Sequence, residues 1–389
     1  MTKIFITIPW FLPAFRAGGP IQSVANLVKE FHDEVEYYIF CSDTDLNGGA
    51  IENITTGEWI YYNDYTRVWY AHHEKISDSL VKQVEAINPG ILYIIGLYSW
   101  HFNMVPLIFC KHPKKILSVR GMLHPGALLQ KKWKKKIYLQ LFKLLEYHHK
   151  IVFHATDAAE DEYIRTHFGK VAAISIAGNL PNKIGALPVA KKEPGSLTLI
   201  SIALISPMKN ILMVIEALGK IKSAVQYDIY GPVKDAGYWE ECLVKIKSLP
   251  PNIKVMAHKE IDPSKVKEAL TGAHVFILPS KSENFGHAIY EALSAGRPVI
   301  TSNHTPWNNL QESCAGINVS VEDNVELTDA INFFAAMDEP TLIQWQQEAI
   351  NYAARAIDME KIRGQYREMF LTSPSLLDYC VDTSILEAI

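Results

Sequence analysis

The chain has 389 residues, which is enough for two domains that each bury a substantial hydrophobic core. Hydrophobic residues make up 48% of it and charged residues 21%, values typical of a soluble globular protein and not of a disordered or fibrous one. The formal net charge of −4 excludes a general attraction to nucleic acid or to an acidic membrane, so any such contact must be local.

Five cysteines are widely scattered and form no Cys-x-x-Cys pair, which favours reduced thiols and no structural zinc in a cytoplasmic protein. The first 13 residues resemble a short signal peptide, but Pro9 and Pro13 interrupt the apolar run and no small-residue cleavage site follows. We therefore expect residues 3–8 to form the first strand. No stretch of about 20 uninterrupted apolar residues exists, so we expect no membrane-spanning helix.

Strands alternate with helical segments along the first half of the chain, which predicts a parallel, doubly wound sheet. The strands are expected at residues 3–8, 35–40, 67–71, 91–97, 115–119 and 151–154. Gly18 and Gly19 lie between the first strand and a helix expected at 21–31, where paired glycines let the backbone approach a ligand closely. A merely flexible turn is the alternative. Asp43 and Asp45 follow the second strand, and we interpret this Asp-x-Asp as a solvated loop.

Arg120 and His124 directly follow the strand expected at 115–119. Ligands of doubly wound sheets bind outside the carboxyl ends of the strands, so both side chains are placed to contact a ligand. An arginine there could clamp a phosphate or a carboxylated acceptor, or it could be a structural ion-pair partner. Both interpretations are open from the sequence.

The one charge run of the chain lies at residues 131–136, where five lysines begin a helix with an apolar stripe. The stripe consists of Trp133, Ile137, Leu141, Leu144 and Leu145. This combination could hold the protein against an anionic membrane that carries a lipid-linked acceptor. The alternative is a helix packed on the core with a solvated basic end.

The polar stretch at 191–196 contains proline and glycine and is the expected interdomain linker. The alternation then restarts, with strands expected at 197–203, 227–230, 253–256, 275–278 and 299–301. Lys209 directly precedes a helix expected at 211–221, where its ammonium group would reach phosphate oxygens beside the first helical amides. A last helix is expected at 359–370, and the tail at 372–389 carries no interpretable pattern.

The most informative stretch is the strand expected at 275–278, the polar turn after it, and a helix that begins near Gly286. The first amides of a helix have no partner inside it and the helix dipole favours negative charge, so this arrangement can hold an anion. Glu283 and Glu291 lie on either side of the helix start, with seven residues between them. A diphosphate on the amides would then have a carboxylate on each side, and each carboxylate can accept hydrogen bonds from hydroxyl groups.

This stretch resembles the donor-site signature of the retaining GT-B glycosyltransferases of family GT4. The matching residues are Glu283, Phe285, Gly286, Glu291, the run Gly-Arg-Pro-Val-Ile-Thr-Ser at 296–302, and Thr-Pro-Trp at 305–307. The resemblance implies an α/β protein of GT-B architecture, with two Rossmann-like, doubly wound parallel-sheet domains facing a cleft. The domains are expected at 1–190 and 197–355, joined by a linker at 191–196. A crossover helix at 356–371 would return to the first domain, before the tail at 372–389.

The resemblance also implies roles for individual residues. Lys209, Glu283 and Arg120 would act in catalysis, with Arg120 in the place of a histidine that many GT4 members carry. His124 would lie on the acceptor side. The residues that would bind the donor are Gly18, Gly19, Asn210, Phe285, Gly286, His287, Ala288 and Glu291. Leu204 departs from the family, which usually has an arginine there, so one phosphate-binding cation is absent from its usual position.

The implied reaction moves a hexose-type unit from a nucleotide diphosphate sugar to an acceptor hydroxyl with retention and without a metal or other cofactor. The expected partners are the donor and a saccharide or lipid-linked acceptor in cell-surface polysaccharide or glycolipid assembly, with no nucleic acid. The expected location is cytoplasmic, with peripheral contact through the lysine helix on the inner face of the membrane. A GT-B sugar-nucleotide epimerase or hydrolase, or a non-catalytic sugar-nucleotide-binding protein, is the alternative.

Overall fold

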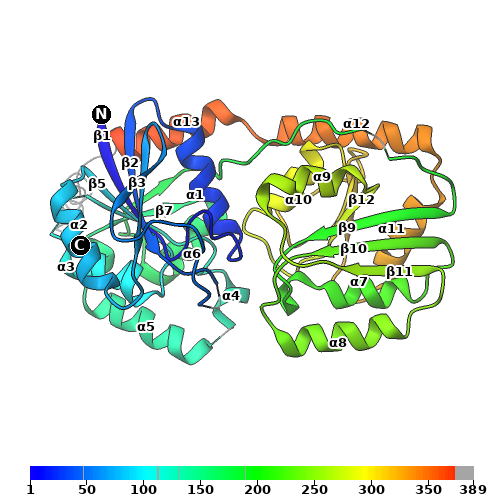
Figure 1. Ribbon diagram of the computed structural model, residues 1–389, viewed down its shortest axis with the longest axis horizontal. Coiled ribbons are helices and arrows are strands. Elements are labelled where there is room, and N and C mark those ends of the chain that lie inside the picture. Colours follow the sequence, from blue (N-terminus) through cyan, green and yellow to red (C-terminus); the bar gives the residue numbers. More distant parts are fainter. Residues whose placement is uncertain (47, 112–113, 130, 189, 373–389) are drawn as a thin grey trace, which may run out of the picture. The chain divides into compact units, whose positions relative to one another are not determined.

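The computed structural model describes residues 1–46, 48–111, 114–129, 131–188 and 190–372 (Figure 1). The chain forms two compact units. The first contains Met1–Leu180 and residues 359–372, and the second contains Pro181–Asp358. Nearly all of the tail expected at 372–389 lies outside the described residues.

The first unit is built on an eight-stranded sheet with the order β3-β4-β2-β1-β5-β6-β7-β8. All neighbouring strands are parallel except β3 and β4, which form an antiparallel hairpin. The strands are β1 (Thr2–Thr7), β2 (Val35–Ser42), β3 (Trp59–Asn63), β4 (Thr66–Ala71), β5 (Ile91–Ile95), β6 (Lys115–Ser118), β7 (Val152–Ala155) and β8 (Ile174–Ile176).

Helices cover this sheet, and the central strands are therefore buried along most of their length (Figure 1). The helices are α1 (Gly19–Glu30), α2 (Ile76–Ile87), α3 (Val105–Phe109), α4 (Pro125–Leu129), α5 (Lys132–Leu144), α6 (Ala158–Phe168) and α13 (Met359–Arg367). Short turns of other helix types lie at Trp100–Met104, Tyr147–His149 and Glu368–Thr372.

The second unit is built on a six-stranded, fully parallel sheet with the order β11-β10-β9-β12-β13-β14. The strands are β9 (Ser196–Ile202), β10 (Ala224–Tyr230), β11 (Ile253–Ala257), β12 (Val275–Leu278), β13 (Val299–Ser302) and β14 (Gly316–Val319). The helices are α7 (Ile211–Leu218), α8 (Ala236–Lys247), α9 (Val266–Thr271), α10 (His287–Ser294), α11 (Val325–Ala336) and α12 (Glu339–Ala356), with 3-10 turns at Pro207–Lys209 and Pro263–Lys265.

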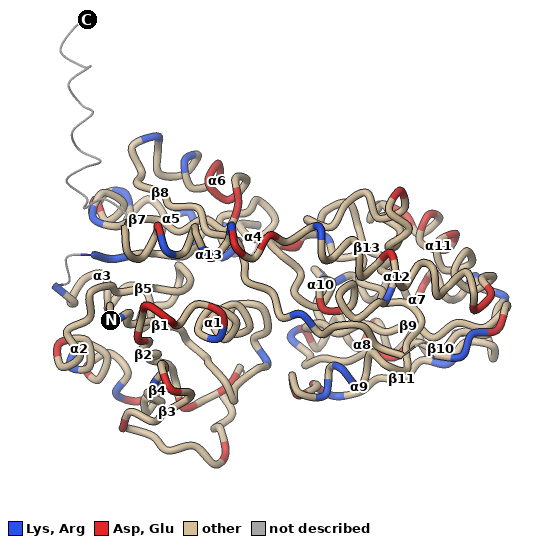
Figure 2. Tube along the Cα trace, turned by 90° about the horizontal axis from the view of Figure 1, so that it is seen from above, with Lys and Arg blue, Asp and Glu red and all other residues tan. Residues whose placement is uncertain are grey.

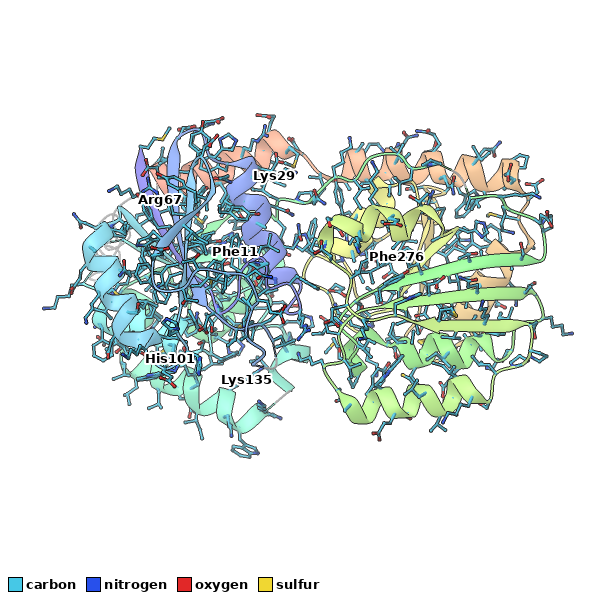
Figure 3. All side chains as sticks on the ribbon, viewed as in Figure 1. Phe11, Lys29, Arg67, His101, Lys135 and Phe276 are labelled. Atoms are coloured by element: carbon cyan, nitrogen blue, oxygen red, sulfur yellow. The ribbon has the colours of Figure 1, made fainter. Side chains whose placement is uncertain are left out.

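The core of the second unit surrounds the middle strands β9 and β12, whose apolar residues belong to one buried cluster. Phe276 of β12 is fully buried in that cluster and is labelled in Figure 3. This order of strands reverses direction between β9 and β12, because β10 lies on one side of β9 and β12 on the other. Loops at such a switch point open at the carboxyl edge of the sheet, where doubly wound folds bind ligands.

The predicted α/β class with two doubly wound sheets is confirmed, and every strand expected from the sequence is present to within a few residues at its ends. The strands β3, β8 and β14 were not predicted. The chain passes between the units at Leu180 and again at Asp358, whereas residues 191–196, expected as the linker, lie within the second unit. In the described part of the chain, no helix is both long enough and apolar enough to cross a bilayer.

Candidate functional site

The turn between β12 and α10 is held in one shape by hydrogen bonds from β13 and the segment after it. Ser302 donates to the carbonyl of Ser280, and the backbone amide of Glu283 donates to the carbonyl of His304 over 3.2 Å. The Trp307 indole donates from Nε1 to the carbonyl of Phe285 over 2.5 Å. These three hydrogen bonds fix the path of the turn.

Gly286 caps the N-terminus of α10 in a left-handed conformation, with φ of 77°. A Cβ at this position would lie 3.1 Å from Cδ1 of Ile289 and 3.3 Å from Nε1 of Trp307. Any other residue would therefore have a strained backbone and would crowd both neighbours. The glycine thus lets the chain turn sharply into the helix. The first amides of α10 are the groups that a bound anion would use.

Lys209 and Glu283 form an ion pair at this turn, although 74 residues separate them in the chain. The pair is largely shielded from solvent, since the exposed fractions of the two side chains are 22% and 10%. Ser280 also donates from Oγ to Oε1 of Glu283, over 2.8 Å. A cation, a carboxylate and a hydroxyl therefore meet beside the start of α10.

The segment that carries Lys209 is joined to the same turn. Its 3-10 turn Pro207–Lys209 leads into α7, and the amide of Lys281 donates to the carbonyl of Met208 over 2.8 Å. Asn210 has a positive φ of 58° and its side-chain amide donates to Sδ of Met213 over 3.0 Å, so this side chain points along α7. Asn210 shapes the turn through its backbone, while Lys209 supplies the charge.

Glu291 lies further along α10, where Asn182 donates a hydrogen bond to its carboxyl group. Desolvation by burial raises the pKa of Glu291 to about 7, and the hydrogen bond from Asn182 opposes that rise. A carboxyl group with such a pKa changes its charge near neutral pH. The predicted pair of acids thus consists of a salt-bridged carboxylate and a carboxyl group with a raised pKa.

Phe285, His287 and Ala288 lie at the same helix start. The ring of Phe285 packs against His287 with centroids 4.8 Å apart and edge-on against Trp307 at 5.3 Å. Ala288 is partly buried against the core of the second unit. These residues form an apolar wall beside the helix amides.

Gly18 and Gly19 are exposed at the start of α1 in the first unit. Gly18 has a φ of 72°, and a Cβ on either glycine would meet no atom of the described residues within 4 Å. The backbone there is open to a ligand. The approach of a ligand to the glycine pair stays a prediction.

Arg120 points into the first unit instead of toward solvent. Its guanidinium donates to Oδ1 of Asn179 over 2.8 Å and to the hydroxyl of Tyr93 over 3.0 Å. Desolvation opposes its charge, but Tyr93, Tyr366 and Glu160 outweigh that effect and raise the pKa of Arg120 above its ordinary value. These contacts favour the structural role that the sequence analysis left open beside the phosphate-binding one.

His124 and His154 complete this region of the first unit. His124 accepts a hydrogen bond from the amide of Gly126 over 3.1 Å, and its ring packs edge-on against Tyr163. His154 was not singled out from the sequence, yet it is fully buried and lies 2.7 Å from the hydroxyl of Tyr93. Burial and the nearby Arg120 lower the pKa of His154 to about 3, so the ring is neutral.

Tyr230 and His258 were also missed, although each follows or ends a strand at the carboxyl edge of the second sheet. Their rings stack with centroids 4.1 Å apart and planes 7° from parallel, and His258 lies 2.8 Å from Asp228. The available signal was that Tyr230 ends β10 and His258 directly follows β11. No group of three or more His, Cys, Asp or Glu side chains among the described residues is arranged to hold a metal ion.

Comparisons with known proteins bear on both units. Residues 187–352 match the family model described as glycosyl transferases group 1. No curated protein matches the chain.

Several solved structures resemble the chain over nearly its whole length. Sucrose-phosphate synthase from Thermosynechococcus elongatus is 19% identical, with a TM-score of 0.71 over 95% of this chain and 99% of that one. Alr3699/HepE from Anabaena, crystallised with UDP and glucose, is 15% identical, with a TM-score of 0.69 over 96% and 100%. TarM is 15% identical, with a TM-score of 0.71 over 96% and 99%. At these identities the similarity establishes the shared fold.

Proposed function

We propose that this chain, which has the GT-B fold, is a group 1 glycosyl transferase that moves a sugar from a nucleotide diphosphate sugar to the hydroxyl group of an acceptor. The observation that carries the proposal is the contact of Lys209 with Glu283 beside the N-terminus of α10. A cation next to the N-terminus of a helix suits a diphosphate. A carboxylate held by that cation and by Ser280 suits the hydroxyl groups of a sugar.

In this proposal the diphosphate binds to the amides at the start of α10, and Lys209 donates to its oxygens. As the bond between the anomeric carbon and the diphosphate breaks, negative charge grows on the leaving oxygen. The helix dipole and the Lys209 ammonium are already oriented toward that charge, which stabilises the transition state without reorganisation. The chemistry proposed here needs no metal.

Glu283 positions the sugar by accepting hydrogen bonds from its hydroxyl groups, and Glu291 does the same for the ribose. Neither acts as a covalent nucleophile in this proposal. The acceptor oxygen bonds to the anomeric carbon on the face that the leaving group vacates, and the departing phosphate takes up the proton of the acceptor hydroxyl. The sugar therefore keeps its anomeric configuration. Phe285 and Trp307 keep the turn in place and shield one side of the diphosphate from water.

For the first unit we propose that the open backbone at Gly18 and Gly19 contacts a ligand, and that His124 lies on the acceptor side. Arg120 is proposed as a positioning residue, because its guanidinium is occupied by Tyr93 and Asn179. It would hold the loop after β6, which leads to His124.

The comparison structures suggest which ligands to test first. HepE was crystallised with UDP-glucose, and a TarM variant with UDP and alpha-GlcNAc-glycerol. We propose a nucleotide sugar donor and a saccharide or lipid-linked acceptor for this chain, in the assembly of a cell-surface polysaccharide or glycolipid on the cytoplasmic side of the membrane.

A panel of nucleotide diphosphate sugars tests the proposal. Thermal shift should identify a donor that stabilises the protein, because a ligand that binds only the folded state raises the melting temperature. With that donor and a mixture of saccharide acceptors, nucleotide diphosphate should be released and a glycoside formed. Glu283→Gln should reduce the release strongly, whereas the exposed-surface control Glu312→Gln should leave it unchanged.

Three outcomes would contradict the transferase. Isomerised or hydrolysed donor, formed at the same rate with and without acceptor, would identify an epimerase or hydrolase. Tight donor binding that Glu283→Gln leaves unchanged, without turnover, would identify a binding protein. Leu204 in place of the usual arginine is the sequence feature that suggests this alternative. Full turnover by the Glu283→Gln variant would contradict the proposed role of Glu283 in the donor site.

A further inference from the structure

Helix α5 of the first unit has two apolar faces, and only one of them is packed. At about 100° per residue, Tyr138, Leu139 and Phe142 lie on one side of the helix. Leu139 and Phe142 are buried in the core cluster of that unit. The second apolar face is the exposed stripe, which consists of Trp133, Ile137, Leu141, Leu144 and Leu145.

The exposed stripe is unusually open for residues of this kind. The exposed fraction is 76% for Trp133, 55% for Ile137 and 77% for Leu144. These three side chains point within about 40° of one another around the helix axis, so they form a continuous ridge along it. As in the sequence alternative, the helix packs on the core and has a solvated basic end, but the packing is made by Leu139 and Phe142 and not by the exposed stripe.

The packed face fixes how the helix is turned. The ring of Phe142 lies 5.4 Å from that of Phe168 in α6, and the ring of Tyr138 lies 5.2 Å edge-on from that of Tyr98. The Tyr138 hydroxyl also contacts Sδ of Met104. Burying the exposed stripe by rolling the helix would break these contacts, so the stripe stays outward in the folded unit. Figure 1 shows α5 at the outer edge of the first unit.

The charge of the helix is entirely positive. Residues 131–145 contain six lysines and no Asp or Glu, although the whole chain carries a net charge of −4. Lys135 turns inward, where its amine donates to the carbonyl of Ala127 and lies 5.0 Å above the ring of Tyr98 (labelled in Figure 3). The other five are exposed, namely Lys131, Lys132, Lys134, Lys136 and Lys143.

We propose that α5 docks the protein onto the surface of an anionic lipid bilayer. Trp133, Ile137 and Leu144 would enter the boundary between headgroups and acyl chains, with the helix lying in the plane of the membrane. The exposed lysines would remain at the level of the anionic headgroups, which their long side chains can reach. The helix thus lies on the bilayer and does not span it.

The positive charge of α5 favours an anionic bilayer, and not a second copy of the chain, as the partner of the exposed stripe. An isologous contact between two α5 helices would bring the lysines of one copy against those of the other without an acid on the helix to neutralise them. An anionic bilayer supplies both an apolar interior for the stripe and negative charge for the lysines. This proposal goes beyond the donor site and does not depend on it, since none of its residues belongs to that site.

Flotation with lipid vesicles tests the proposal on the full chain. The protein should float with vesicles of mixed phosphatidylglycerol and phosphatidylcholine, remain unbound with phosphatidylcholine alone, and be released by high salt. Lys132→Gln/Lys134→Gln/Lys136→Gln should weaken binding by about 100-fold, because each lysine near such a surface contributes a factor of about five. Trp133→Ser/Ile137→Ser/Leu144→Ser should abolish it.

A matched control is available in the second unit. Helix α8 also carries an exposed apolar residue and nearby lysines, so Val244→Ser/Lys245→Gln/Lys247→Gln changes similar chemistry on another surface. This variant should float like the wild type. All variants should keep the wild-type melting temperature to within a few degrees, because each change is on an exposed surface.

Equal recovery of the wild type and the lysine variant with anionic vesicles would overturn the proposal. The proposal would also be overturned if the wild type sediments as a dimer, the Trp133→Ser/Ile137→Ser/Leu144→Ser variant sediments as a monomer, and neither binds vesicles. That result would assign the exposed stripe to self-association. A wild-type protein that floats with anionic vesicles but turns over no donor would refute the proposed function and leave the membrane proposal standing. The two proposals can therefore fail separately.

Discussion

Lys209 is the residue whose removal should most directly affect the proposed chemistry. Its ammonium group is largely buried against Glu283, so it needs no reorganisation to face charge that develops on a diphosphate. Lys209→Ala should therefore remove about 2–4 kcal/mol of transition-state stabilisation, which lowers kcat/KM roughly 30-fold to 1,000-fold. Steady-state kinetics with the donor identified by thermal shift measures this loss.

The exposed Lys247 in α8 provides the control, since Lys247→Ala removes an equal charge from the same unit. A double-mutant cycle with Glu283→Gln then separates the two roles. The single losses should sum to more than the loss of the double variant, because both side chains act on one ligand and contact each other. Strict additivity of the two losses would contradict a shared site.

Glu291 should make both stability and donor binding depend on pH. Its pKa is raised from an ordinary 4.5 to about 7, so between these pH values the folded state holds a proton that the unfolded state has lost. Stability should therefore fall as pH rises through this window and then level off. Glu291→Gln removes the titrating group, and its stability relative to wild type should increase over the same window. Denaturant unfolding at a series of pH values measures the difference.

Donor binding by the same residue should change in the opposite direction. In the proposed site the ribose hydroxyls donate to an ionised Glu291, so wild-type donor affinity should increase as pH rises through about 7. Glu291→Gln should bind the donor more weakly at high pH and lose most of this dependence. A wild-type affinity that does not change across this range would contradict the role of Glu291, even if the stability profile follows the prediction.

The local features of the site could be predicted from the sequence, whereas the partners of single side chains could not. Gly286 and the two acids follow from a strand, a polar turn and a helix that are contiguous in the chain. The contact between Glu283 and Lys209 joins two βα turns, and only a resemblance to a family places these turns together. Arg120 shows the opposite case, since Tyr93 and Asn179 come from distant segments and turn its side chain inward.

At the scale of single elements, the start of α10 depends on Gly286. An alanine there would adopt a left-handed conformation, which costs about 1–2 kcal/mol, and its Cβ would crowd Ile289 and Trp307. Gly286→Ala should lower the melting temperature moderately and should weaken donor binding by more than that loss of stability explains, because the helix amides move with the turn. Melting curves and donor titrations measure both effects.

Gly272 provides a matched control at the end of α9. Its φ is ordinary, and a Cβ there would meet no described atom within 4 Å. Gly272→Ala should therefore leave both melting temperature and donor affinity close to wild type. If Gly286→Ala binds the donor as tightly as this control, the amides of α10 are not the anion site.

Elements with mixed exposure are those that the sequence analysis missed or misplaced. Strand β3 is an edge strand whose residues are partly or fully exposed, so it lacks the apolar alternation that marks a strand. Residues 191–196 have the composition of a linker, yet Lys192 is buried and its amine donates to the carbonyls of Ala335 and Met337 at the end of α11. A lysine that caps a helix cannot be distinguished from a solvated one by composition alone.

At the scale of the whole molecule, the first unit is discontinuous in sequence. The chain from Met359 returns to it and completes its core, where Phe370 packs against Phe31 at 6.2 Å and against Tyr93 at 5.4 Å between ring centroids. Ion pairs from Arg363 to Glu30 and from Arg367 to Glu34 add to this contact. Figure 2 marks all Lys and Arg residues in blue and all Asp and Glu residues in red along the chain. The second unit is one continuous stretch, Pro181–Asp358.

This organisation predicts that each unit has its own unfolding transition. Phe370 should contribute to the stability of the first unit, although it follows the second unit in the chain. Phe370→Ala should cost about 3–5 kcal/mol, as expected for a large buried aromatic side chain, and should lower one transition in calorimetry. Phe334→Ala, which empties a fully buried position in α11 of the second unit, should lower the other. If both substitutions lower the same transition equally, the two units unfold as one cooperative body and each depends on the other for stability. If only Phe334→Ala has an effect, the returning segment does not contribute to the core of the first unit.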